Sequence, residues 1–313
     1  MGLKSWLVQR MTRWLAKERP LSDMPLCDFD RLSLEIRPGD VLLVEGRSRV
    51  SDIIKNITQT AWTHSALYVG RLHDIEDPSL RALVRKFYGG DEGEQLLIEA
   101  LLGEGTLVVP LAKYRGEHLR ICRPRGLSRQ DAQRIIEYCA HHLGTDYDLR
   151  QLLDLARFMV PYTVLPRRWR SSLFEHNAGI PTRTVCSSMI AAAFTGVHYP
   201  ILPVIQRGAD GKLQLYKRNT RLFTPRDFDY SPYFDIIKYP ILGVDDLALY
   251  RQLPWNQDGV ICNDENDCFI PELGRRSSPA AHATDAEAVT GVEPVAPRRK
   301  GKVIFFGKKK GAS

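Results

Sequence analysis

Five short apolar segments constrain the fold of this chain more than any other feature of its sequence. Segments of this length, rich in Val, Ile and Leu and bounded by turn residues, are typical of β-strands. Because the turns are tight and few connections are long, we predict one antiparallel sheet, curled enough to resemble a half-barrel. The five segments are residues 41–46, 61–70, 95–100, 105–110 and 118–123.

Helical periodicity dominates the sequence between and after these strands. Residues 49–60 carry apolar side chains at helical spacing just before the second strand. Residues 128–144 begin with a capping pattern and continue with an apolar face, and further helices are predicted for 149–161 and 186–196. Residues 234–239 are predicted to form a closing strand. A sheet followed by helices predicts an α+β fold.

The two ends of the chain differ in composition from its middle, which predicts three regions. Residues 1–20 are basic and contain two tryptophans. We interpret them as an amphipathic helix that either lies in a membrane interface or docks on the domain or on another subunit. Residues 21–273 carry the predicted strands and helices. Residues 274–313 have too few large apolar side chains to offset the entropy of ordering, so we predict a disordered basic tail.

Composition also indicates the partners and the cellular compartment of the protein. Its 313 residues are 43% apolar, and much of the net charge of +7 lies at the two ends, which favours anionic surfaces over nucleic acid as partners. No signal peptide or spanning helix is predicted. The six cysteines form no CxxC pair, so we expect reduced thiols in a cytoplasmic protein, or one peripheral on the inner face of the membrane.

No cofactor or metal is expected from the sequence. Neither a GxGxxG segment nor a P-loop is present. Cys262 and Cys268 lie close together, but no histidine accompanies them as zinc-ligand spacing would require. The basic excess is not interleaved with aromatic residues as in grooves that bind single strands. We therefore expect no nucleic acid, metal ion or cofactor.

Cys186 lies where an extended segment turns into a helix rich in small residues. Unpaired backbone N–H groups and the positive end of the helix dipole favour the thiolate at such a position. A cysteine nucleophile also needs a base and a group that orients the base. The alternative is that Cys186 is a small buried apolar residue of the helix.

Two further residues are candidates for the base and its orienting group. His64 begins the second strand on the face predicted to carry Trp62, and Glu99 falls late in the third strand, so the two can meet across the sheet. Taken singly, each has an ordinary interpretation as a half-buried histidine or a surface carboxylate. His118 is the rival histidine, at a strand position expected to be solvated, and Glu104 is an alternative acid.

Five motifs in order resemble those of the circularly permuted NlpC/P60 cysteine hydrolases. They are most similar to the YiiX/YebB-like group, which is related more distantly to the lecithin:retinol acyltransferase family. In the non-permuted enzymes the cysteine helix precedes the histidine strand, whereas here His64 comes before Cys186. The motifs are residues 39–43, 62–69, 98–100, 143–148 and 185–194, and the resemblance covers about residues 36–240.

The resemblance implies a permuted papain-like fold, in which a curled antiparallel sheet packs against helices and the nucleophile lies at a helix N-terminus. It implies that Cys186 is the nucleophile, that His64 is the general base and then acid, and that Glu99 orients His64. Tyr147 matches a tyrosine that lines the site and is implied to help bind the oxyanion. Residues 21–273 would then form one catalytic domain.

The implied reaction is acyl transfer, in which a thiolate attacks an amide or ester carbonyl and the resulting thioester passes to water or another acceptor. We expect a cysteine-dependent hydrolase or acyltransferase. Members of the permuted branch are associated with lipid-like acyl substrates, and residues 3–17 with the basic tail suit an anionic leaflet, so we favour a lipid over a peptide substrate. The alternative is a catalytically vestigial, membrane-peripheral module that binds lipid or peptide.

Overall fold

The structure, a computed structural model, divides the chain into two units, Met1–Gly243 and Val244–Ser313. The predicted boundaries at residues 20 and 273 stay predictions. The helix predicted at 149–161 and the tail predicted at 274–313 lie outside the described residues, as does most of the N-terminal segment. The described residues are 10, 14, 17–20, 26–101, 104–145, 186–208, 210–244, 246–256, 258, 260–264 and 267–270.

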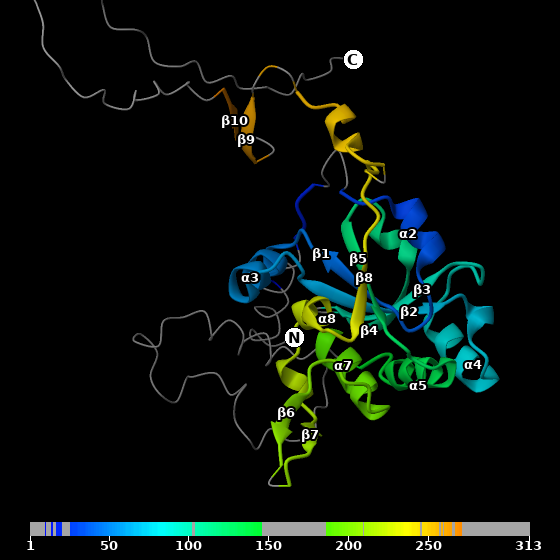
Figure 1. The fold of residues 1–313 in the computed structure, drawn as a ribbon. Coiled ribbons are helices and arrows are strands. Elements are labelled where there is room, and N and C mark those ends of the chain that lie inside the picture. The colour runs from blue at the N-terminus through cyan, green and yellow to red at the C-terminus, as the bar shows by residue number, and fades with distance from the viewer. Residues whose placement is uncertain are drawn as a thin grey trace, which may run out of the picture. The chain divides into compact units, whose positions relative to one another are not determined.

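A six-stranded antiparallel sheet lies at the centre of the first unit, with strand order β4-β3-β2-β1-β5-β8 (Figure 1). All five predicted strands are present, and the predicted closing strand pairs with β5 at one edge. The α+β prediction and the antiparallel pairing are therefore confirmed. The strands of this sheet are β1 Val41–Glu45, β2 His64–Gly70, β3 Leu96–Leu101, β4 Gly105–Pro110, β5 His118–Pro124 and β8 Phe234–Ile237.

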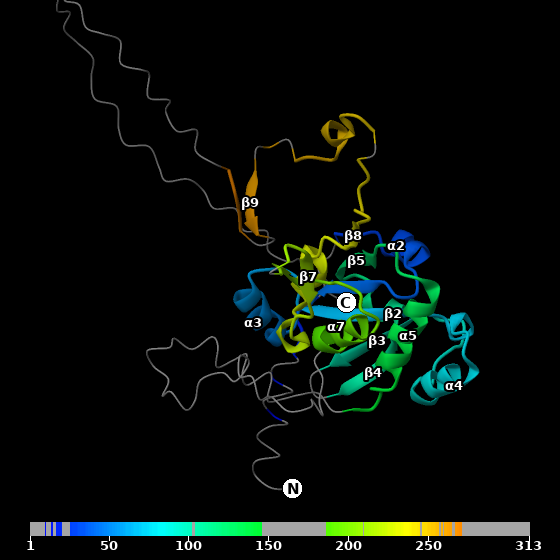
Figure 2. The same cartoon turned by 60° about the horizontal axis from the view of Figure 1, so that its bottom comes forward.

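Helices cover both faces of the sheet, so its central strands are apolar on both sides. Alternation along β1 directs Leu43 into a core shared with α5 and α7, whereas Leu42 packs into a second core with α2. Figures 1 and 2 show α5 and α7 on one face of the sheet and α2 on the other. The helices are α2 Phe29–Glu35, α3 Arg49–Thr58, α4 Pro78–Phe87, α5 Arg129–Ala140, α7 Cys186–Gly196 and α8 Pro225–Tyr230.

Shorter elements connect these layers or extend from them. The 3-10 helix η2, Leu111–Tyr114, joins β4 to β5, and the hairpin β6–β7 follows α7 (Figure 1). No helix among the described residues is long and apolar enough to cross a bilayer. The remaining short elements are η1 Leu72–Asp74, β6 Val204–Arg207, β7 Leu213–Tyr216, η4 Thr220–Leu222, η5 Leu249–Gln252, β9 Ile261–Asp264 and β10 Asp267–Phe269.

Helix α7 has the bounds that the sequence predicts, residues 186 to 196. It is apolar on nearly every side, which is typical of a buried helix, and it packs against α5 and β2. Ala191 and Ala193 are buried and small, so the helix approaches its neighbours closely. Its N-terminus, with Cys186, therefore lies beside β2.

The prediction that Trp62 and His64 share one face of the second strand is wrong. Strand β2 begins only at His64, and the chain enters it from α3 through a left-handed residue, Gln59. The alternation of the strand therefore does not extend back to Trp62. The indole packs in the core shared with α7, whereas Ala66 belongs to the core on the α2 side.

The expectation of reduced cysteines is wrong for Cys262 and Cys268, which form a disulfide in the second unit. Antiparallel pairing of β9 and β10 places the two residues opposite each other, with Cα atoms 3.9 Å apart. The spacing alone does not reveal this hairpin, since neither strand carries an apolar alternation. The other four cysteines, Cys27, Cys122, Cys139 and Cys186, are free and buried.

Candidate active site

Cys186 is the first residue of α7, and its side chain is buried against β2. The N–H groups of a helix's first turn have no partner within the helix, so this end of α7 is a favourable place for a negative charge. Burial opposes ionisation and is the largest single influence on the pKa of Cys186. The imidazolium of His64 and hydrogen bonds from His64 and Ser65 outweigh it, so that the pKa of Cys186 is lowered from its ordinary value.

Ser65 contributes to this environment from the strand next to the helix. Its side chain is fully buried, and its hydroxyl makes no hydrogen bond to an oxygen or nitrogen atom within the described part of the chain. The hydroxyl can therefore turn toward the sulfur of Cys186. Together with the Ser65 backbone N–H, it favours the thiolate.

His64 and Glu99 meet across neighbouring strands, with 2.7 Å between His64 Nε2 and Glu99 Oε2. Leu67 of β2 lies opposite Ile98 of β3, so His64 and Glu99 occupy diagonal positions on one face of the sheet. The structure thus brings together the three residues that the sequence singles out, Cys186, His64 and Glu99.

Opposite charges hold these groups ionised although they are buried. Burial is the largest influence on the pKa of His64 and lowers it, but the Cys186 thiolate and the Glu99 carboxylate together raise that pKa to about 10. For Glu99, burial raises the pKa, while His64 and Lys113 lower it to about 2. At neutral pH Glu99 is therefore a carboxylate and His64 an imidazolium, and the lowered pKa of Cys186 favours its thiolate.

Two further residues hold the carboxylate of Glu99, and the sequence interpretation missed both. Lys113 Nζ lies 2.7 Å from Glu99 Oε1, and the hydroxyl of Tyr114 donates to Glu99 Oε2. A carboxylate with no exposed surface needs such partners to stay charged. Both residues belong to η2, which follows a proline and carries no sequence motif. They are identified only by their contacts with Glu99 of β3 in the folded chain.

Replacing Lys113 is expected to weaken the acid stability of the fold. The pKa of Glu99 is about 2 in the folded protein, well below its value of about 4.3 in the unfolded chain. Ionised Glu99 therefore adds to the free energy of unfolding above about pH 4.3, and this contribution is lost as the pH falls toward about 2. In Lys113→Met the folded pKa of Glu99 rises. The midpoint of acid unfolding should then move to higher pH, with a loss at neutral pH of about 1 kcal/mol or less because Lys113 is partly exposed.

Acid titrations followed by circular dichroism measure this shift. The matched control is Lys86→Met, an exposed lysine on α4 whose Nζ lies over the ring of Phe87. Equal midpoints for the two variants would contradict a role for Lys113 in holding Glu99.

His118 does not occupy the solvated turn that the sequence predicts for it. Glu45 of β1 lies opposite His118 in the sheet, and His118 Nδ1 is 2.9 Å from Glu45 Oε2. The imidazole also packs 5.1 Å from the ring of Trp62, measured between centroids. His118 therefore belongs to a separate ionic cluster, in which Lys55 also binds Glu45.

The remaining site predictions have different outcomes. Tyr147 lies outside the described residues, so its assignment to the oxyanion stays a prediction. Glu104, the alternative acid, is exposed in the turn between β3 and β4, whereas Glu99 is buried against His64. Among the described residues, no group of three or more His, Cys, Asp or Glu side chains is placed to hold a metal ion.

Known proteins resemble this chain over the region that carries His64 and Glu99. Residues 35–156 match a family described as permuted papain-like amidase enzymes, YaeF/YiiX, C92 family. The crystal structure of the metalloprotein YiiX from Escherichia coli O157:H7 is 13% identical, with a TM-score of 0.39. That match covers 65% of this chain and 97% of the other. Over residues 35–156, which carry His64 and Glu99, this chain is therefore similar to the permuted papain-like amidases of the YaeF/YiiX family.

Proposed function

We propose that this protein is a cysteine hydrolase that cleaves an amide or ester through a thioester on Cys186. The observation that carries the proposal is the buried row of Cys186, His64 and Glu99, in which each charge stabilises the next. A thiolate at a helix N-terminus, paired with an imidazolium, is the activated form of a cysteine nucleophile.

In the first half-reaction the Cys186 thiolate attacks the carbonyl carbon, and the carbonyl oxygen takes up the negative charge. The free N–H groups at the start of α7, including that of Cys186 itself, are suited to bind this oxyanion. His64 donates its proton to the leaving amine or alcohol as the carbon–heteroatom bond breaks. The products are the free leaving group and an acyl thioester on Cys186.

In the second half-reaction neutral His64 takes a proton from water, whose oxygen attacks the thioester carbonyl. The carbon–sulfur bond breaks, the acid leaves, and Cys186 returns to the thiolate beside protonated His64. Glu99 accepts a hydrogen bond from His64 throughout, which fixes the ring and stabilises the imidazolium. An alcohol or amine acceptor in place of water would make the same enzyme an acyltransferase.

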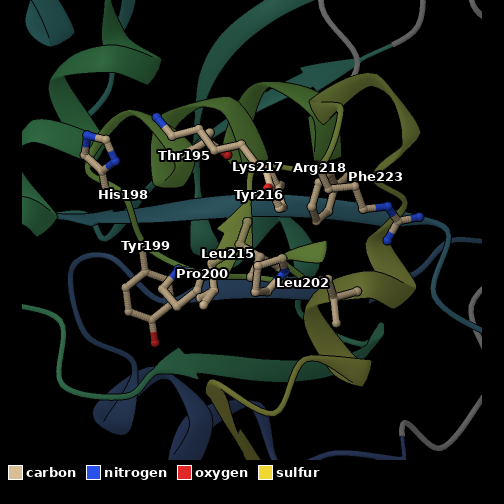
Figure 3. Close-up of a pocket in the computed structure, with 12 residues that line it drawn as sticks. Thr195, His198, Tyr199, Pro200, Leu202, Leu215, Tyr216, Lys217, Arg218 and Phe223 are labelled. Carbon is tan, nitrogen blue, oxygen red and sulfur yellow. The ribbon is translucent and has the colours of Figure 1, made fainter. Parts of the chain in front are cut away.

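A pocket beside α7 has both apolar and basic side chains in its lining, and we assign its apolar part to the acyl group of the substrate (Figure 3). The side chains of Leu202, Leu215 and Phe223 line a cavity of about 160 Å³ there. Phe223 also accepts a hydrogen bond through its backbone carbonyl from the hydroxyl of Ser187, the residue after the nucleophile, at 2.7 Å. We therefore favour a lipid or other acyl substrate over a peptide.

The membrane setting forms part of the same proposal. Residues 3–17 and the basic tail would attract the protein to an anionic inner leaflet, where lipid-like substrates lie. Two described residues, Trp14 within this segment and Arg19 just after it, contact α3. The guanidinium of Arg49 lies over the Trp14 ring, and Arg19 pairs with Asp52 at 2.6 Å.

Alkylation by iodoacetamide tests the proposed thiolate directly. At pH 6 we expect Cys186 to react much faster than Cys27, Cys122 or Cys139, because burial raises the pKa of each of those thiols. Peptide mass spectrometry locates the adduct, and Cys186→Ser should remove the fast phase. Slow alkylation of Cys186, at the rate of the other buried thiols, would overturn the proposal and favour the vestigial binding module.

A further inference from the structure

The hairpin β6–β7 exposes an unusual amount of apolar surface. Side chains of both strands are between 45% and 63% exposed, and neither hydrophobic core of the first unit includes them. An isolated two-stranded hairpin is only marginally stable in water, and contiguous exposed apolar side chains mark an interaction surface. The apolar residues concerned are Val204, Ile205, Leu213, Leu215 and Tyr216.

The pairing register gathers three of these side chains on one face. Ile205 lies opposite Leu215, and Arg207 lies opposite Leu213, so these four residues alternate onto the same side of the hairpin. The opposite side carries the pair Gln206 and Gln214, and next to it the pair Val204 and Tyr216. One face is therefore mainly apolar with a single arginine, and the other has a polar centre.

Basic residues lie on the hairpin and directly after it. Arg207, Lys212 and Lys217 are exposed. The acidic residue of the hairpin, Asp210, lies near the turn, and its carboxylate is 3.8 Å from the ammonium of Lys212. Apolar side chains framed by lysine and arginine match the interfacial region of an anionic bilayer, where acyl chains lie beneath phosphate groups.

The hairpin also adjoins the pocket beside α7, since Leu215 and Tyr216 contribute to the lining (Figure 3). From these observations we infer that the β6–β7 hairpin is a membrane-docking element. Its apolar face enters the headgroup region of an anionic bilayer, and its basic residues contact lipid phosphates. This inference does not require Cys186 to be a nucleophile, and it concerns a surface separate from residues 3–17.

Vesicle binding by the full chain tests the inference without reference to activity. Cosedimentation is measured with vesicles of equal parts phosphatidylglycerol and phosphatidylcholine, and with phosphatidylcholine alone. The triple variant Ile205→Ser, Leu213→Ser, Leu215→Ser should bind the anionic vesicles at least tenfold more weakly. The matched control, Gln206→Ser with Gln214→Ser on the other face, should bind as the unmodified chain does.

A charge variant separates the two parts of the interaction. Lys212→Gln with Lys217→Gln should weaken binding to the anionic vesicles by about fivefold for each lysine and reduce its salt dependence. Binding to phosphatidylcholine alone should not change. Thermal unfolding and the alkylation rate of Cys186 show whether each variant retains its fold, so a loss of binding through misfolding is recognised.

Three results would overturn the inference. One is equal vesicle binding by the triple variant and its control. Another is binding that survives in the triple variant and disappears when residues 1–17 are deleted, which would assign docking to the N-terminal segment. The third is concentration-dependent self-association, seen by sedimentation and abolished by the triple variant, which would make a second copy of this chain the occupant of the face.

Discussion

The Cys186→Ala variant is expected to lose at least about 1,000-fold in turnover while keeping its fold, because the attacking atom of the reaction is removed. Alanine is smaller than cysteine and suits the start of a buried helix, so unfolding should change little. Release of p-nitrophenol from p-nitrophenyl octanoate and of p-nitroaniline from the matching anilide measures ester and amide cleavage separately.

The matched control for this variant is Cys139→Ala. Cys139 is a buried thiol of α5 whose pKa is raised by burial alone, so it has no partner that would activate it. We expect this variant to lose stability through the small cavity and to keep its turnover. If Cys186→Ala hydrolysed both reporters as fast as Cys139→Ala, the assignment of Cys186 as nucleophile would be wrong.

The second large effect is expected for His64→Ala. In the unmodified protein the Cys186 thiolate predominates at every pH above the lowered pKa of Cys186. The imidazolium of His64 remains protonated up to about pH 10. Without His64, burial is the largest remaining influence on Cys186 and disfavours the thiolate. The half-rise of the alkylation rate should then move above the ordinary cysteine pKa of about 8.5, and turnover should fall by about 1,000-fold.

His118→Ala is the matched control for this measurement. His118 is also a half-buried histidine bonded to a carboxylate, but its partner is Glu45. We expect the alkylation profile of Cys186 to stay as in the unmodified protein. A shift of the same size in both variants would show that the thiolate responds to general changes in the sheet rather than to His64.

Local patterns predict most of the fold correctly. The apolar run at β1 and the helical spacing at α3 depend on neighbouring residues, and each element lies close to where the sequence predicts it. The start of β2 is the exception. Trp62 precedes the strand, and the bend from α3 turns its side chain to the opposite face, which no alternation pattern can reveal.

The residues of the site likewise divide into those that local patterns predict and those that only tertiary contacts reveal. Cys186, His64 and Glu99 are recognisable because their residue types recur within ordered motifs. Lys113 and Tyr114 are not, because η2 is a short connection without a motif, and its contact with Glu99 depends on how the chain folds back. The disulfide between Cys262 and Cys268 depends likewise on pairing between two strands of weak pattern.

Local residue patterns therefore predict the antiparallel sheet and the helix that begins at Cys186, because each depends on neighbouring residues, and the order of His64 before Cys186 is read directly from the chain. What surrounds the reactive groups depends instead on the tertiary structure. The partners that keep Glu99 charged, the separation of His118 into another cluster and the exposed face of the β6–β7 hairpin all follow from contacts between distant segments. Such contacts are set by packing and strand register, which local residue patterns do not encode.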